Sequence, residues 1–92
     1  MKYKLIISSA IKEAIRSFPP LLKKQVHGGL DAIQENPHIG KPLHEELAGY
    51  WTYRVNQYRI VYSIHHHQIE VQIIGIGPRA LIYEQVLGFI RS

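Results

Sequence analysis

The spacing of the hydrophobic residues changes within the first forty positions, from alternation to steps of three or four. Alternation at the N-terminus predicts a strand over residues 2–8, with apolar side chains at Tyr3, Leu5 and Ile7. A spacing of three or four residues then predicts a first helix, which Ser8 or Ser9 would cap. The apolar face of this helix consists of Ile11, Ala14, Ile15 and Phe18.

A second helix is predicted after the pair Pro19-Pro20, because proline ends one helix and suits the first turn of the next. It should stop before Pro37. The pair Gly28-Gly29 weakens this helix, and close packing against the sheet would be a reason for two glycines to be tolerated there. The buried positions of the second helix are Leu22, Val26, Leu30 and Ile33.

The second half of the chain is predicted to contain most of the sheet. Residues 37–49 form a loop rich in proline and glycine, and strands follow at roughly 50–55, 58–65 and 68–76. Helical spacing returns over residues 79–91. The order of elements, β-α-α-β-β-β-α, predicts an α+β domain with helices packed on one antiparallel-rich sheet.

Strand alternation sorts the side chains of residues 50–64 onto two faces, if Asn56-Gln57 is a two-residue hairpin loop. The face expected to lie under the helices contains Trp51, Tyr53, Val55, Tyr58, Ile60, Tyr62 and Ile64. The other face, expected to be a half-polar surface, contains Tyr50, Thr52, Arg54, Arg59, Val61 and Ser63. With His66-His67 as the next loop, this second face also gains Glu70, Gln72 and Ile74.

The same register places Arg54 directly opposite Arg59. Like charges in this position destabilise a sheet, and a guanidinium stays charged at any working pH and binds phosphate with two hydrogen bonds. A phosphate seated between the two arginines would relieve the repulsion. The alternative is that the side chains point into water, or that one of them pairs with Glu70.

Composition limits the chemistry further. The chain is long enough for one domain, residues 1–92, and has no cysteine for a disulfide, a thiolate metal site or a thiol nucleophile. Its formal net charge of +4 favours a polyanion or an acidic protein surface as the partner, unless the charge only keeps the protein soluble.

The run Leu5-Ile6-Ile7 is too short for a signal peptide and no stretch would span a membrane, so a cytoplasmic location is expected. Neither a cofactor nor a metal is expected, because consecutive residues such as His65, His66 and His67 cannot all point at one ion.

The run from Gly40 to Tyr83 resembles the RelE/ParE superfamily of toxins from bacterial toxin–antitoxin pairs. The positions that carry the resemblance are Leu47, Gly49, Trp51, Arg54, Tyr58, Arg59, Tyr62, Gly77, Arg79 and Tyr83. It implies two N-terminal helices packed on a curved, antiparallel-rich, four-stranded sheet, followed by a short C-terminal helix. It also implies a cognate antitoxin that covers the functional cations, with exposed residues of the last helix such as Leu87 and Phe89 in the interface.

The superfamily contains two activities, and the pair Arg79 and Tyr83 is similar to the RelE-like side, whose members cut mRNA in the ribosomal A site. The resemblance implies a metal-independent endoribonuclease whose partners are the antitoxin, the ribosome and mRNA. Catalytic roles would fall to Arg59, Arg79, Tyr83 and His44, and phosphate binding to Arg54 and Lys41. The general base stays open, because His44 can equally be an exposed bystander and Glu45 and Glu46 can simply close a turn.

Two alternatives accompany this interpretation. One is a ParE-like inhibitor of DNA gyrase that leaves RNA intact. The other is a catalytically decayed toxin that only binds its antitoxin. Direct DNA binding is expected of the antitoxin rather than of this chain.

Overall fold

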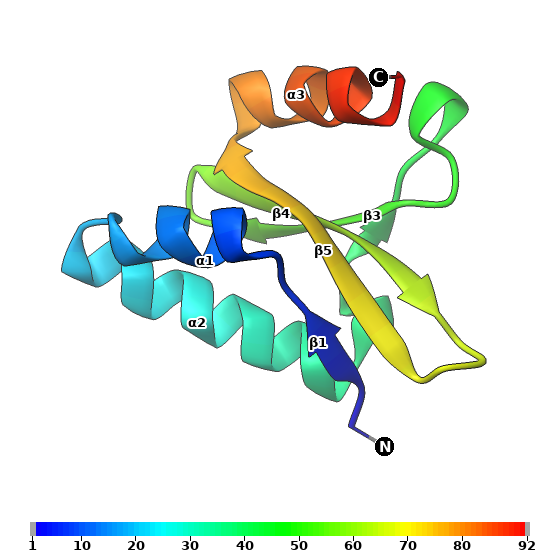
Figure 1. Ribbon diagram of the computed structural model, residues 1–92, viewed down its shortest axis with the longest axis horizontal. Helices are drawn as coiled ribbons and strands as arrows, with labels where there is room; N and C mark the ends of the chain where they lie inside the picture. The colour runs from blue at the N-terminus through cyan, green and yellow to red at the C-terminus, as the bar shows by residue number, and fades with distance from the viewer. Residues whose placement is uncertain (1, 92) are drawn as a thin grey trace.

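A five-stranded mixed sheet forms the centre of the protein in the computed structural model, which describes residues 2–91 (Figure 1). Its strand order is β1-β5-β4-β3-β2, with β1 parallel to β5 and all other pairs antiparallel. The strands are β1 (Lys4–Ile6), β2 (Lys41–Pro42), β3 (Trp51–Val55), β4 (Tyr58–His65) and β5 (Glu70–Pro78). The helices are α1 (Ser9–Arg16), α2 (Pro20–Glu35) and α3 (Arg79–Arg91), with short 3-10 turns η1 (Pro37–Ile39) and η2 (Glu45–Leu47).

The predicted α+β class and the boundaries of α2 and α3 are confirmed, whereas α1 ends at Arg16, before Phe18, and the sheet has five strands instead of four. The additional strand, β2, lies inside the expected loop and pairs Lys41 with Thr52 and Pro42 with Trp51. Two residues are too few to show any alternation, so the sequence pattern could not reveal this strand.

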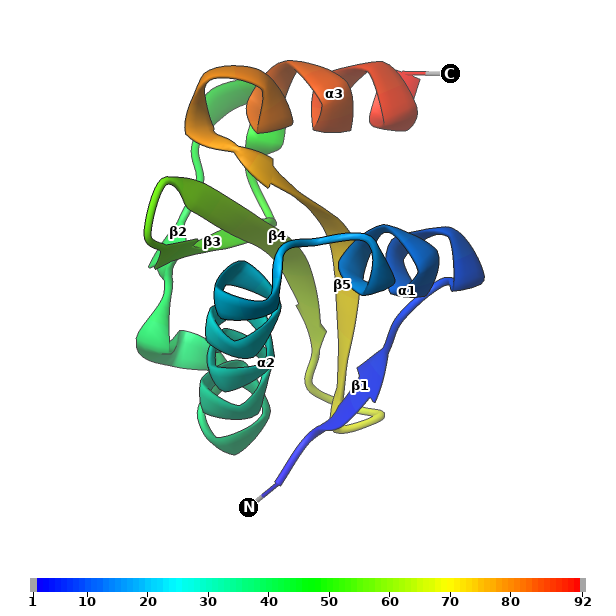
Figure 2. The same cartoon turned by 90° about the vertical axis from the view of Figure 1, so that its left-hand side faces the viewer.

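Helices α1 and α2 cover one face of the sheet and enclose the larger core (Figure 2). Ser8 caps α1 by accepting a hydrogen bond from the backbone N–H of Ile11 at 3.2 Å. The predicted apolar face of α1 was wrong at Ala14, which is exposed. The buried members of this core are Ile15, Val26, Leu30, Ile33, Val55, Ile60, Tyr62, Val71 and Ile73.

Helix α3 lies across the opposite face, so the surface expected to be half-polar is partly a second core (Figure 1). Val61 is completely buried there and Thr52 is 7% exposed. Gly75 and Gly77 allow α3 to approach β5 closely, since a Cβ at these positions would lie 3.1 and 3.3 Å from Cδ1 of Ile82. No helix within residues 2–91 is long and apolar enough to cross a membrane.

The two hairpins differ in how well they were predicted. Asn56-Gln57 is the predicted two-residue loop, and Asn56 takes the left-handed φ of 60° that asparagine tolerates. The second loop was predicted wrongly: it spans residues 66–69, and a bulge leaves Ile74 without a partner on β4. The register near this loop shifts by two residues, an even number, so Glu70 and Gln72 remain on the predicted face.

Candidate anion-binding site

Three arginines meet where the first hairpin reaches the start of α3. Arg54 lies directly opposite Arg59 across β3 and β4, which confirms the predicted register. Arg79 is the first residue of α3, and all three line one pocket of about 220 Å³ together with Asn56 and Gln57. We call Arg54, Arg59 and Arg79 the arginine cluster.

The backbone of the hairpin loop holds this cluster together. Arg54 Nε donates a hydrogen bond to the carbonyl oxygen of Asn56 at 3.0 Å. The backbone N–H of Arg79 donates to the carbonyl oxygen of Gln57 at 3.1 Å, which ties the first turn of α3 to the loop. These two bonds fix the Arg54 side chain and the start of α3, while the β3–β4 register places Arg59 opposite Arg54, so the three arginines line one hollow without an acidic side chain.

The cluster has no carboxylate partner among residues 2–91. The ion pairs there are Lys2–Glu35, Arg16–Glu13 and Arg91–Glu46, so the alternative pairing of an arginine with Glu70 is not found. The first turn of α3 also contains no acidic residue, and the positive end of the helix dipole adds to the potential. An anion from outside the chain is the species that this arrangement would stabilise.

A wider hollow of about 600 Å³ adjoins the arginine pocket and shares Gln57 and Arg79 with it. Tyr83, one turn along α3, lines this second hollow. The phenol of Tyr83 lies 3.2 Å from Oγ1 of Thr52, and either oxygen can be the donor. The hydrogen bond fixes the tyrosine beside the arginines.

Of the two site residues predicted in the 37–49 segment, Lys41 lies on the side of the sheet that carries the site and His44 lies outside both hollows. Lys41 pairs with Thr52 in the β2–β3 ladder, and paired residues point to the same face, so it shares the side of the sheet on which Tyr83 lies. His44 is exposed before η2 and lines neither hollow. Glu46 binds Arg91 at the end of α3, and Glu45 is an exposed residue of the same turn.

A buried tyrosine anchors the segment that carries Lys41. The hydroxyl of Tyr62 is completely buried and donates to the carbonyl oxygen of Pro37 at 2.5 Å. Burial raises the pKa of Tyr62 to about 12, so the hydroxyl remains a donor at any physiological pH. Gly40 permits the close approach, because a Cβ there would lie 2.4 Å from this hydroxyl oxygen.

Sequence reasoning missed three participants in this region. Thr52 was placed on the correct face, but its contact with Tyr83 depends on where α3 crosses the sheet. Asn56 and Gln57 were recognised only as a turn, whereas their carbonyl groups position Arg54 and Arg79. The alternating pair Gly75 and Gly77 was an available signal for a closely packed helix on this face.

Comparisons with known proteins agree on one family. The sequence pattern of the family described as ParE toxin of the type II toxin–antitoxin system parDE matches residues 8–83. The toxin RelG of Mycobacterium tuberculosis is 30% identical over 87 residues, which cover 92% of this chain and all of RelG. The toxin RelE of the same organism is 43% identical over 52 residues, 55% of this chain and 54% of that protein.

Solved structures of toxins have the same fold. The toxin–antitoxin complex RelBE2 of M. tuberculosis contains a chain with a TM-score of 0.76 and 27% identity, covering 87% of this chain and 94% of the other. A double arginine-to-alanine mutant of E. coli RelE in the free state matches with a TM-score of 0.75 and 21% identity. That match covers 98% of this chain and 99% of RelE.

Proposed function

The chain belongs to the ParE toxin family of type II toxin–antitoxin systems, and we propose, from the residues of its arginine cluster, that it is a ribosome-dependent mRNA endonuclease that acts without a metal ion. Similarity to the toxins RelG and RelE supports the RelE-like side of the superfamily. Its partners under this proposal are a cognate antitoxin and mRNA in the ribosomal A site, in the cytoplasm.

The arginine cluster beside Tyr83 is the observation that supports this proposal. RNA cleavage through the 2′-OH puts additional negative charge on the phosphoryl oxygens in the transition state. Arg59 and Arg79 line the same pocket and lack a carboxylate partner among the described residues, so they can stabilise that charge. Arg54 and Lys41 would hold the neighbouring backbone.

In this proposal, Tyr83 is the residue that helps to transfer a proton during RNA cleavage. Neither hollow is lined by a histidine or a carboxylate in the part of the chain that the structure describes, and His44 lies outside both. Tyr83 is a titratable group that lines the larger hollow, and Thr52 holds its hydroxyl. Catalysis would then depend mainly on alignment of the RNA and on the arginine charges.

The test is brief induction of the chain alone, followed by primer extension on an abundant mRNA. Wild-type protein should generate new 5′ ends in translated regions within minutes. Arg59→Ala and Arg79→Ala should abolish them, because each removes a charge that faces the phosphoryl group. Arg16→Ala is the matched control, since Arg16 lies on α1 and pairs with Glu13. Intact transcripts with the wild-type protein would contradict the nuclease.

A gyrase inhibitor is the second candidate, and the ParE description of the matching family favours it. Tyr50 and Thr52 carry no ammonium group, whereas RelE-like members commonly add lysines there, and this departure weighs against catalytic competence. DNA breaks and an SOS response with intact mRNA would establish this function. Normal growth during induction would instead indicate a decayed toxin.

A further inference from the structure

The chain contains six histidines, and the structure brings two of them together from distant parts of the sequence. His38 lies in η1, which follows α2, and His66 begins the loop between β4 and β5. Their imidazole rings are nearly parallel, with an angle of 10° between the planes and 5.3 Å between the ring centroids. Both side chains are exposed, so an ion can reach them from the solvent. We call His38 and His66 the histidine pair.

Aromatic side chains from two further segments position the histidine pair. The ring of Trp51 on β3 packs edge-on against His38, with the ring centroids 5.2 Å apart. The ring of Tyr3 packs edge-on against His66, and its hydroxyl oxygen lies 3.4 Å from Nδ1 of this histidine. When Nδ1 carries the proton, His66 donates to the Tyr3 hydroxyl and presents the lone pair of Nε2 to a ligand. Metal-binding histidines commonly have this arrangement, in which a neighbouring group holds the second ring nitrogen.

The separation of the two rings suits the coordination of one ion. Zinc binds an imidazole nitrogen at about 2.0–2.1 Å, which puts the centres of two imidazoles on a tetrahedral ion roughly 5 Å apart. The ring centroids of the histidine pair are 5.3 Å apart. Parallel rings do not aim at a common point, but the torsion about the Cβ–Cγ bond of a histidine has a broad energy minimum. Rotation of the exposed His38 ring can therefore direct a nitrogen to the ion that Nε2 of His66 faces.

The chemistry of the ligands selects the class of ion. Neutral imidazole suits Zn²⁺, Ni²⁺ and Cu²⁺, whereas Mg²⁺ and Ca²⁺ prefer oxygen ligands. Within residues 2–91, no group of three or more His, Cys, Asp or Glu side chains could hold a metal ion. The ion would therefore have two protein ligands and complete its coordination with water, so a chelator should remove it readily.

We propose that the histidine pair binds a divalent transition-metal ion such as Zn²⁺. The ion would tie η1 to the loop between β4 and β5 and stabilise the folded chain, because the unfolded chain does not hold these two histidines together. This place is far from the arginine cluster along β4, since Arg59 lies near the start of the strand and His66 follows its end (Figure 1). The ion would thus take no part in the chemistry at the arginines.

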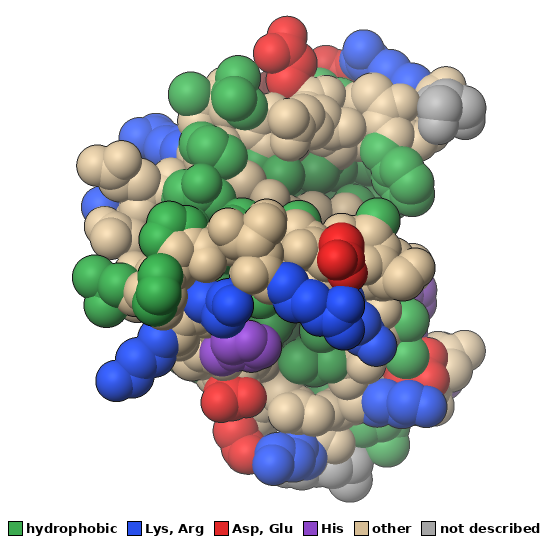
Figure 3. All heavy atoms as spheres, turned by 60° about the vertical axis from the view of Figure 1, so that its left-hand side comes forward, with side chains coloured by type: hydrophobic (Ala, Val, Ile, Leu, Met, Phe, Trp, Pro, Cys, Tyr) green, Lys and Arg blue, Asp and Glu red, His purple; other side chains and the backbone are tan. Residues whose placement is uncertain are grey.

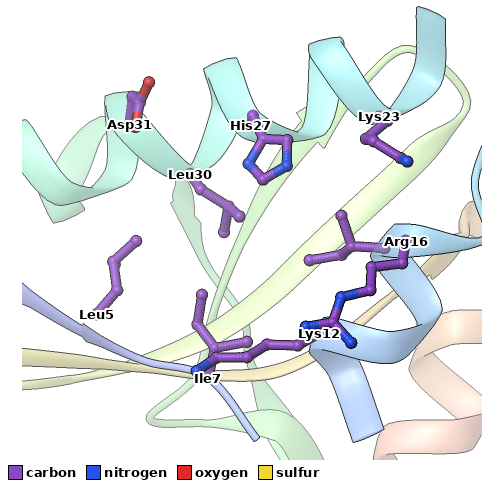
Figure 4. Close-up of a pocket in the computed structure, with 9 residues that line it drawn as sticks. Leu5, Ile7, Lys12, Arg16, Lys23, His27, Leu30 and Asp31 are labelled. Carbon is purple, nitrogen blue, oxygen red and sulfur yellow. The ribbon is translucent and has the colours of Figure 1, made fainter. Parts of the chain in front are cut away.

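His27 provides a control in the opposite electrostatic setting. It lies in a groove between α1 and α2 that Lys12 and Lys23 also line (Figure 4). The space-filling view shows Lys and Arg side chains gathered beside a histidine in the middle of this face (Figure 3). Positive charges so close to an imidazole repel a metal ion, so His27 should not contribute to binding.

The test is calorimetric titration of the purified chain, without a histidine tag, with ZnCl₂. The wild type should bind one ion per chain, and MgCl₂ should give no binding heat. Tyr3→Phe keeps the ring, removes the hydroxyl that holds His66, and should lower the affinity about tenfold. His38→Gln and His66→Gln should each lower it further, because one imidazole remains. His67→Gln removes a histidine from the same loop and should leave the affinity unchanged, as should His27→Gln.

His38→Gln distinguishes the histidine pair from the run of three histidines at the end of β4. Zinc binding that survives His38→Gln and falls in His67→Gln would assign the ion to the loop alone and overturn the proposal. Absence of zinc binding to the wild type would overturn it as well. In NMR spectra of the wild type, Zn²⁺ should shift the imidazole signals of His38 and His66 while those of His27 stay in place. A His38 signal that does not move would equally count against the site.

A stability measurement gives a further readout. Zn²⁺ well above its dissociation constant should raise the melting temperature of the wild type, and EDTA should reverse the rise. His38→Gln should show neither effect, and an equal rise in this variant would contradict the site. The outcome does not depend on the nuclease proposal, because His38→Gln retains the arginine cluster and should act on mRNA as the wild type does.

Discussion

The arginine cluster should make the free protein less stable than it could be, and replacing Arg59 with glutamine tests this. Arg59 is half-buried on β4 opposite Arg54, and no hydrogen bond or ion pair holds its guanidinium within the described residues. Glutamine keeps much of the aliphatic stem that packs on the sheet and removes the charge. We therefore expect Arg59→Gln to raise the free energy of unfolding while it abolishes RNA cleavage.

The size of the effect follows from the geometry. Directly opposed side chains on an antiparallel pair lie close enough for like charges to destabilise it by roughly 0.2–1 kcal/mol. Arg79 in the same pocket adds a second repulsive neighbour, so a gain of about 0.5–1 kcal/mol is expected. For a domain of this length, such a gain raises the melting temperature by about 2–8 °C.

The assay is chemical and thermal unfolding of purified wild type and variant at low salt, at high salt and with phosphate. High salt should reduce the difference in free energy of unfolding between Arg59→Gln and the wild type, because the Debye length falls from about 10 Å at 0.1 M to about 3 Å at 1 M. Phosphate at about ten times its dissociation constant should stabilise the wild type by ~1.4 kcal/mol and the variant much less. Arg16→Gln, which breaks the pair with Glu13, should give no gain. A destabilised Arg59→Gln, or a gain that salt leaves unchanged, would refute the reasoning.

Two further predictions concern the packing that supports the site. The pKa of Tyr62 is raised to about 12 in the folded state, whereas an unfolded tyrosine ionises near pH 10. The free energy of unfolding should therefore fall by about 2–3 kcal/mol as the pH rises from 10 to 12, because the neutral hydroxyl that the fold favours is then ionised. Tyr62→Phe should remove that part of the pH dependence and cost about 1 kcal/mol at pH 7, measured by denaturant titration; an unchanged alkaline slope would contradict it. Gly29→Ala should lower the melting temperature, because its Cβ would lie 2.7 Å from Cγ2 of the buried Val55, an overpacking of about 1–3 kcal/mol. Gly28→Ala, with nothing within 4 Å, should raise stability by about 0.5–1 kcal/mol, and equal effects at both glycines would be inconsistent with this packing.

Strong periodicity and clear stop signals account for the parts of the fold that the sequence predicted well. Ser8 and Pro20 mark helix starts, and the alternation through Asn56-Gln57 leads to one register that buries a complete apolar face. The expectation that a close contact explains the glycine pair holds for Gly29, which packs on β3, and not for Gly28.

The failures have a common physical cause. Strand β2 has two residues, and the four-residue second loop begins with polar residues that suit either a strand or a turn. Gly75 and Gly77 allow α3 to pack closely on the face opposite α1 and α2, and the sequence pattern did not show which face it would cover. Local patterns specify elements, whereas tertiary packing decides which face a terminal helix covers.

The same division applies to the site. The opposition of Arg54 and Arg59 is a matter of register and could be predicted, but the addition of Arg79 depends on the bond from its backbone N–H to Gln57. Carbonyl groups of Asn56 and Gln57 in one hairpin loop accept from Arg54 and Arg79, while strand pairing places Arg59. A site held by carboxylates would have to release them before a phosphate could bind, and their charge would oppose its entry. A site held by neutral carbonyls keeps its positive charge available, so the phosphate proposed above would enter without displacing any bond that positions Arg54 or Arg79.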